Sequence, residues 1–229
     1  MPFAATNLFT IVAVSCVVLS GCAQRDAADR QKPDLDPTTN SKKMLTPETL
    51  AEVSELVRSG FYDKERLMEV LCEEMYSPGE LDRKDVEAAL DLAFAKWESE
   101  KQTWPDVTDC DRLDSAFAAI EGRGVIPLQN AGNTQSDGHD DFRDTYDSHP
   151  NKASVIGYCF YHGQDLERAV RGEGLMIAFG PVDPKDEETK GAEVGNIIRE
   201  ELERAGFKVD WNGKFDRRLN IPDLVWQRR

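Results

Sequence analysis

The sequence predicts an α+β fold in which an N-terminal three-helix segment precedes a mixed or antiparallel sheet with helices on one face and a C-terminal β-hairpin. Helical periodicity runs through residues 46–103. Residues 155–161 and 175–179 are nearly continuous apolar stretches, which is typical of strands buried on both faces. Asn212-Gly213 lies between alternating apolar residues and predicts the hairpin turn. No Gly-rich phosphate loop follows a strand, so the pattern does not favour a Rossmann-like domain.

Four helices are expected before the sheet begins. Thr46 and Pro47 begin the first and Gly60 ends it, the second begins near Asp63, and Asp82 begins the third. These three helices lie in a predicted helical segment, residues 44–105. The fourth begins the α+β domain that follows, residues 106–229. The elements expected in that domain are, in order, a helix from Asp109 or Asp111, a strand over 125–129, a long loop over 130–153, a strand over 155–161, a short helix over 164–171, a strand over 175–179, a helix over 189–205 and the two hairpin strands over 207–221.

The net charge of the chain limits the classes of partner that it is expected to bind. The 229 residues contain 28 basic and 43 acidic side chains, for a net charge of −15. Nucleic acid is not an expected partner, because phosphate binding needs a basic face. Residues 1–43 contribute +1, so residues 44–229 carry −16. An acidic folded domain favours a basic protein partner or a cation.

The N-terminus predicts export and a lipid anchor. Residues 1–21 contain a short apolar run that suits a signal peptide and is too short for a typical spanning helix. The run ends in Leu19-Ser20-Gly21-Cys22, which resembles a bacterial lipobox, and the resemblance implies cleavage before Cys22 and acylation of its thiol. Residues 22–43 are polar and predict a flexible tether. The expected location is the cell envelope, possibly the outer membrane. The first 24 residues carry no Lys or Arg, so a start at Met44 and a cytoplasmic protein stay open as the alternative.

The second half of the chain resembles a known family. The residues that carry the resemblance are TDCDRLDSAFAAIEGRG (108–124), LQNAGNTQSDG (128–138), GYCFYHGQDLERAV (157–170), GLMIAFGP (174–181) and WNGKFDRRLNIPDLVWQRR (211–229). They are similar to an uncharacterised bacterial family classed only as a domain of unknown function. The resemblance implies no activity, cofactor or catalytic residue.

Metal binding is the main alternative to a protein-binding function. All three histidines, His139, His149 and His162, lie in or beside the predicted loop, together with Asp137 and Asp141. Nitrogen and oxygen ligands of this kind suit zinc, but no HExxH or comparable spacing is present. Residues 133–144 also match an EF-hand loop in a degenerate way, since its first position is not Asp and its last is not Glu. A solvated acidic loop with a hydrogen-bonded His162 explains the same residues.

The C-terminus forms a basic and aromatic cluster of Arg217, Arg218 and Trp226. This cluster suits either an anion or the protein's own acidic face. No cofactor is predicted, and no nucleophile motif is present. The sequence therefore predicts a non-enzymatic, lipid-anchored envelope protein whose acidic domain binds another protein. The alternatives are a metal-dependent enzyme or metal-binding domain using residues 133–149 and His162, and a cytoplasmic regulator translated from Met44.

Overall fold

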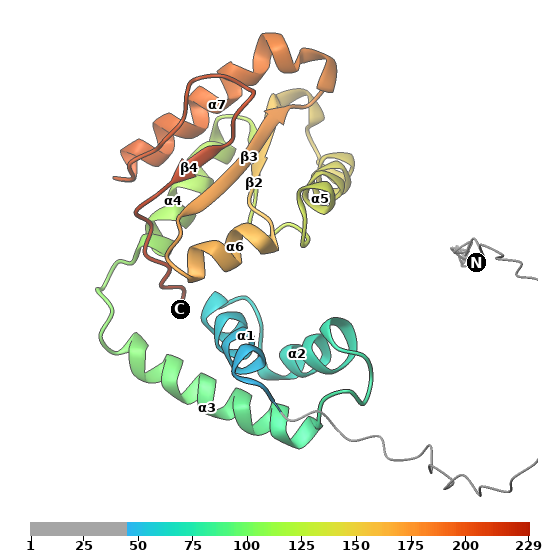
Figure 1. The fold of residues 1–229 in the computed structure, drawn as a ribbon. Helices are drawn as coiled ribbons and strands as arrows, with labels where there is room; N and C mark the ends of the chain where they lie inside the picture. The colour runs from blue at the N-terminus through green and yellow to red at the C-terminus, as the bar shows by residue number, and fades with distance from the viewer. Residues whose placement is uncertain (1–44) are drawn as a thin grey trace, which may run out of the picture. The chain divides into compact units, whose positions relative to one another are not determined.

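The computed structural model describes residues 45–229, which belong to one compact unit (Figure 1). The predicted signal peptide, Cys22 and the tether lie outside the described residues. No helix within residues 45–229 is both long and apolar enough to cross a membrane.

Residues 47–101 are mostly helical. The helical elements are α1 (Pro47–Ser59), α2 (Lys64–Glu69), the π-helical turn η1 (Val70–Met75) and α3 (Arg83–Lys101). The side chains of Thr46, Asp63 and Asp82 accept hydrogen bonds from backbone N–H groups at the starts of α1, α2 and α3, so each helix begins at a capping residue. The helices share one buried apolar cluster, formed by Val53, Val57, Leu67, Leu71, Cys72, Leu81, Val86, Ala89 and Leu90.

Four strands form a mixed sheet, which confirms the predicted α+β class. The elements are α4 (Asp109–Gly122), β1 (Val125–Leu128), α5 (Gln135–Ser148), the 3₁₀ turn η2 (Lys152–Ser154), β2 (Gly157–Phe160), α6 (Gly163–Val170), β3 (Leu175–Pro181), the 3₁₀ turn η3 (Pro184–Asp186), α7 (Glu187–Arg204) and β4 (Leu219–Ile221). The sheet order is β1-β2-β3-β4. β1 and β2 are parallel, whereas β2–β3 and β3–β4 are antiparallel.

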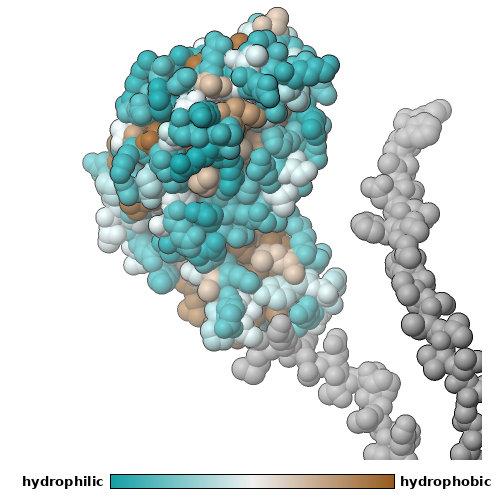
Figure 2. Space-filling view, turned by 45° about the horizontal axis from the view of Figure 1, so that its top comes forward, coloured by the Kyte–Doolittle hydropathy of each residue, from teal (hydrophilic) through white to brown (hydrophobic). Residues whose placement is uncertain are grey.

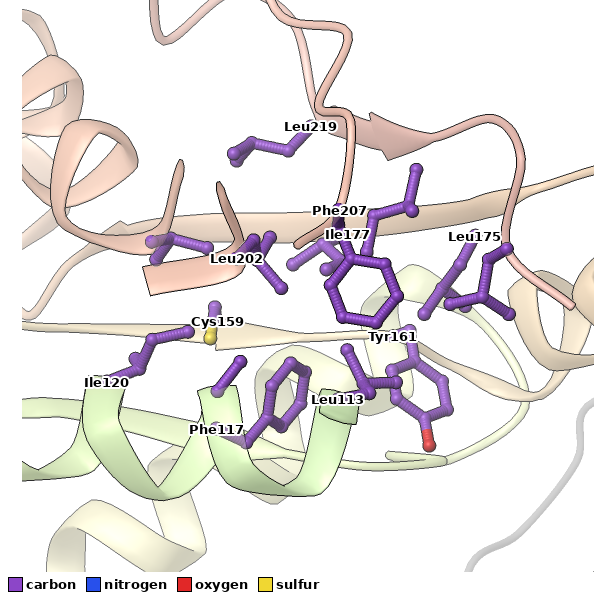
Figure 3. Packing of buried hydrophobic residues seen from close by; sticks show 14 of the residues in the cluster. Leu113, Phe117, Ile120, Cys159, Tyr161, Leu175, Ile177, Leu202, Phe207 and Leu219 are labelled. Atoms are coloured by element: carbon purple, nitrogen blue, oxygen red, sulfur yellow. The ribbon is translucent and has the colours of Figure 1, made fainter. Parts of the chain in front are cut away.

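Helices cover both faces of the sheet, so the prediction that they lie on one face is wrong. On one face, Cys159 and the neighbouring Tyr161 join Leu113 and Phe117 of α4 and residues of α7 in the larger apolar core (Figure 3). On the other face, the remaining β2 side chains pack beneath α5 in a cluster formed by Ile126, Ala131, Phe142, Tyr158, Phe160 and Ala178. Because side chains alternate along a strand, the wholly apolar sequence of β2 supplies both layers.

The predicted loop over residues 130–153 is mostly helix, which corrects the sequence prediction and removes the EF-hand interpretation. α5 begins at the N-cap Thr134, whose hydroxyl accepts a hydrogen bond from the N–H of Asp137, while the Asp137 carboxylate accepts one from the N–H of Thr134. This reciprocal capping box satisfies donors that a new helix leaves unpaired. A helix cannot wrap its side chains around a calcium ion as a 12-residue loop does.

The predicted C-terminal hairpin is reduced to one antiparallel bridge between Asp210 and Asn220. β4 pairs with β3 instead, with Leu219 opposite Ile177. Trp211 explains the difference, because its ring packs edge-on against Phe179 and its indole N–H donates to the carbonyl groups of Lys214 and Arg217. These bonds close residues 211–217 into a loop and leave no second strand.

Candidate functional site

A cleft of about 590 Å³ lies where the loops after the two parallel strands face the N-terminal helices. Asn130, Gly132 and Asn133 follow β1, and Gly163 begins α6 after β2. Opposite them are residues of α1 and of the α2–η1 segment. We call this the α1–α6 cleft. The carboxyl ends of parallel strands are a common place for ligand sites in sheets with helices on both faces, because the following loops diverge there.

Hydrogen bonds hold the two loops of this edge together. The N–H of Gly163 donates to the carbonyl of Gly132 at 2.9 Å, and the N–H of Gln164 donates to that of Asn133 at 3.3 Å. Asn130 donates through its side-chain amide to the hydroxyl of Tyr62 at 2.8 Å, which ties the β1 loop to the helical segment. These hydrogen bonds form within the chain, so the cleft wall made by the loops after β1 and β2 is held in place without a ligand.

Carboxylates outnumber cations on the cleft walls. Glu52, Glu55, Glu74 and Glu167 line it together with Arg66 and Arg171. Arg66 pairs with Glu74 through two hydrogen bonds, of 2.5 and 3.0 Å. Arg171 of α6 donates to Glu55 of α1 at 2.9 Å. Glu52 accepts a hydrogen bond of 2.6 Å from the hydroxyl of Tyr76.

The side-chain carboxylate of Glu167 makes no hydrogen bond or ion pair within residues 45–229. Loss of hydration raises the pKa of its carboxyl, repulsion from Glu55 and Glu52 adds to the rise, and Arg171 opposes it. Burial is the main cause of the rise, and Arg171, which pairs with Glu55 and Glu173, offsets part of the repulsion from the neighbouring carboxylates. A cation placed beside Glu167 would relieve that repulsion.

Apolar side chains lie beside these carboxylates. Leu56, Val70, Leu166 and Val170 line the cleft, and Met75 is 47% exposed at its wall. Hydrophilic residues dominate the face of the protein seen in Figure 2, and hydrophobic residues gather there in small patches. An apolar wall beside a carboxylate that has no ion pair suits a Lys or Arg side chain, whose stem is aliphatic and whose head is cationic.

A second polar cluster joins His162, Asp165 and Arg218. His162 and Asp165 are buried, with exposed fractions of 5% and 1%. His162 Nε2 lies 3.0 Å from the Asp165 carboxylate, and Arg218 donates to both oxygens of that carboxylate at 3.0 and 3.1 Å. Burial lowers the pKa of His162, and the nearby Arg218 lowers it further against the opposing effect of Asp165 and Asp137. A neutral His162 donates through Nε2–H to Asp165, so its buried Nδ1 is an acceptor without a partner among the described residues.

His139, one of the predicted metal ligands, is part of an aromatic cluster. Its ring lies edge-on to the rings of Tyr158 and Phe160, with centroids 5.5 and 5.1 Å away. Burial is the main cause of its lowered pKa. The histidine therefore fills space between α5 and the sheet.

The structure does not gather the remaining predicted metal ligands. Asp137 caps α5 by accepting hydrogen bonds from the N–H groups of Asn133 and Thr134, and Asp141 is exposed on the same helix. His149 ends α5, and its Nδ1 accepts a hydrogen bond from the N–H of the residue two positions on. Within residues 45–229, no group of three or more His, Cys, Asp or Glu side chains is placed to hold a metal ion.

The predicted C-terminal cluster is also divided. Arg217 pairs with Asp210 at 2.8 Å, while Arg218 pairs with Asp165. Trp226 is 5% exposed and belongs to the core. The three residues form no common binding surface, because each satisfies a different contact within the chain.

Sequence reasoning missed the α1–α6 cleft. Glu167 and Arg171 are four residues apart on a predicted helix, which is a weak signal for a charged helix face. Glu52 and Glu55 share a face of another helix for the same reason. Nothing in the sequence indicated that these two faces meet, because their contact depends on how α1 packs against α6.

The fold and the cleft together define an α+β protein with a mixed four-stranded sheet and an acidic cleft beside the parallel strands. Residues 42–229 match a family described as a domain of unknown function (DUF6891), and the chain belongs to this family. The match includes the helical segment as well as the sheet. No curated protein and no solved structure matches the chain.

Proposed function

We propose that this is a non-enzymatic binding protein whose α1–α6 cleft takes a basic segment of another protein. The observation that supports the proposal is the Glu167 carboxylate, which lines the cleft near Glu55 and Glu52 and has no ion pair within residues 45–229, since the nearby Arg171 pairs with Glu55. The aliphatic stem of a Lys or Arg would lie against Leu166 and Val170, and its head would meet Glu167.

The wider charge of the protein supports the same type of partner. The chain carries a net charge of −15, so a basic segment is attracted before it makes specific contacts. Association should therefore become slower as salt is added, because exposed charges are screened over about 8–10 Å at physiological ionic strength.

The binding test uses a panel of labelled peptides of equal length, containing Lys and Arg, only neutral residues, or Asp and Glu. Fluorescence anisotropy with the full chain should detect the basic peptides alone. Glu167→Gln should weaken their binding by about two- to fivefold, as expected for loss of one partly exposed ion pair. Glu121→Gln is the matched control, because Glu121 is exposed on α4 and does not line the cleft. Equal binding of basic and neutral peptides contradicts the proposal.

We also propose that the protein is held in the cell envelope by a lipid on Cys22. The Leu19-Ser20-Gly21-Cys22 motif after an apolar run supports this anchor. Radiolabelled palmitate should enter the wild-type chain and be absent from Cys22→Ala. Sequencing the N-terminus of the native protein separates this from a start at Met44, since a protein beginning at Met44 cannot carry the anchor.

A further inference from the structure

Two carboxylates of the α1–α6 cleft make no ion pair within residues 45–229. One is Glu167 of α6, and the other is Glu52 of α1, which accepts a hydrogen bond of 2.6 Å from the uncharged hydroxyl of Tyr76. Burial is the main cause of the raised pKa of Glu167, and the negative charge of Glu52 adds to the rise. The two carboxylates therefore lie close enough to interact, although they belong to different helices.

Both arginines of the cleft already pair with carboxylates. Arg66 bonds to Glu74, and Arg171 bonds to Glu55. The lining as a whole contains four carboxylates and these two arginines. Two carboxylates therefore remain without an ion pair, one on each of the two helices that give the cleft its name.

Each helix also places an aliphatic side chain about one turn from its unpaired carboxylate. On α1, Leu56 follows Glu52 by four residues, and both line the cleft. On α6, Val170 follows Glu167 by three residues, and both line the cleft. Residues at these spacings lie on the same face of a helix. A Lys or Arg side chain therefore meets the same combination on either helix, apolar surface for its stem and a carboxylate for its head.

A third wall of the cleft is the π-helical turn η1, which contributes Val70, Glu74 and Met75. π-helical turns are rare and are frequent at functional sites. Met75 is 47% exposed, and a Met side chain adapts to apolar groups of different shapes because it is unbranched and flexible. This wall therefore suits the side chains that flank basic residues in a bound segment.

We propose that the α1–α6 cleft takes two basic residues of one segment at once, with one cation at Glu52 and the other at Glu167. The inference rests on the proposed function and specifies its ligand as a segment with two closely spaced Lys or Arg residues. Once the first cation is bound, the second binds within the same complex and needs no second association step. An exposed ion pair is weak, so the second cation should tighten binding by about two- to fivefold.

Peptides of identical composition and net charge separate this arrangement from general attraction to an acidic protein. Each labelled peptide contains two lysines, neutral residues and a run of about ten prolines. In the paired peptides both lysines lie on one side of the run, adjacent or separated by one, two or three neutral residues. In the divided peptide they lie on opposite sides, and the prolines hold them roughly 30 Å apart at about 3.1 Å per residue. A cleft of about 590 Å³ cannot hold both of those lysines.

Fluorescence anisotropy with the full chain should show at least one paired peptide binding about two- to fivefold more tightly than the divided peptide. Glu52→Gln and Glu167→Gln should each remove this advantage, because either change leaves one carboxylate for two cations. Gln at position 52 keeps an oxygen that can accept the hydrogen bond from Tyr76. Glu121→Gln, outside the cleft, should leave the advantage unchanged.

The outcomes distinguish this inference from the proposed function on which it rests. If every paired peptide binds no more tightly than the divided one, while both bind more tightly than a neutral peptide, the inference is overturned and the proposed function stands. An advantage that persists in full in Glu52→Gln also overturns the inference, because the second cation then does not meet Glu52. If no basic peptide binds more tightly than the neutral one, both are overturned.

Discussion

Trp226 should contribute more to the stability of the protein than its position beyond the last strand, β4, suggests. The side chain is 5% exposed, packs against Phe61 and Tyr161, and donates to the carbonyl of Ser59. A Trp of this kind buries roughly 150–250 Å², which at about 25 cal/mol per Å² corresponds to roughly 4–6 kcal/mol. Ala retains part of this burial, while the Ser59 carbonyl loses its partner.

We therefore expect Trp226→Ala to lower the free energy of unfolding by about 4 kcal/mol, within the range of roughly 3–5 kcal/mol for large aromatic truncations. Urea unfolding followed by far-UV circular dichroism measures the loss without relying on the fluorescence of the removed residue. A total stability of about 5–15 kcal/mol is usual for a domain, so the variant should unfold at a much lower urea concentration.

Two further variants make the reasoning specific. Val225→Ala changes the neighbouring side chain, which is 54% exposed, and should alter stability by about 0.5 kcal/mol or less. Trp226→Phe keeps an aromatic ring in the core but removes the indole donor, and should cost about 1–2 kcal/mol. If Trp226→Ala lowers the free energy of unfolding by less than about 1 kcal/mol, or no more than Val225→Ala does, the buried contacts of Trp226 do not stabilise the protein as argued here.

Three other predictions follow from glycine packing, a buried histidine and a buried thiol. A Cβ on Gly138 would lie 2.3 Å from the Phe160 ring, so Gly138→Ala should destabilise the protein by about 1–3 kcal/mol in urea unfolding, whereas Gly122→Ala meets no neighbour within 4 Å and should be neutral or stabilise by up to about 1 kcal/mol. The lowered pKa of His162 means that the unfolded state takes up its proton first, so stability should fall as pH drops from about 6.5 towards the folded-state pKa; an equally steep fall in His162→Gln would contradict this. Burial raises the pKa of Cys110 to about 12, so its thiol should react with a disulfide reagent at neutral pH only after unfolding, as mass spectrometry of the modified peptides can measure.

Helix α5 shows what the sequence could not reveal about the fold. Its residues are mostly polar, and Phe142 and Tyr146 alone provide an apolar pair four positions apart. Gly138, which usually argues against a helix, is required here because the Phe160 ring lies directly against its backbone. The Thr134–Asp137 capping pair was the local signal that could have predicted the helix start. The buried strands, in contrast, were predictable because β2 and β3 are almost wholly apolar.

The candidate site was harder to predict than the fold, because its residues become neighbours only through tertiary packing. Histidine and aspartate near one another in sequence predicted a metal site, yet helix formation directs His139 into the aromatic cluster and leaves Asp141 exposed. His162 and Asp165 are a pair that local spacing could have indicated, because they are three residues apart across the start of α6 and lie 3.0 Å apart.

The carboxylates of α4 and those of the α1–α6 cleft differ in how far basic side chains of the same chain neutralise them. Arg228 and Arg229 pair with Asp114 and Asp111 of α4, so part of the acidic surplus is neutralised by the chain itself. In the α1–α6 cleft, Arg171 lies near Glu167 but pairs with Glu55 and Glu173, so the Glu167 carboxylate has no ion pair within residues 45–229. A basic partner gains the most where a carboxylate is both accessible and unbalanced, and gains little where the protein has already placed an arginine. The location of the unpaired charge, and not the total of −15, is therefore what supports the proposal that the cleft binds a basic partner.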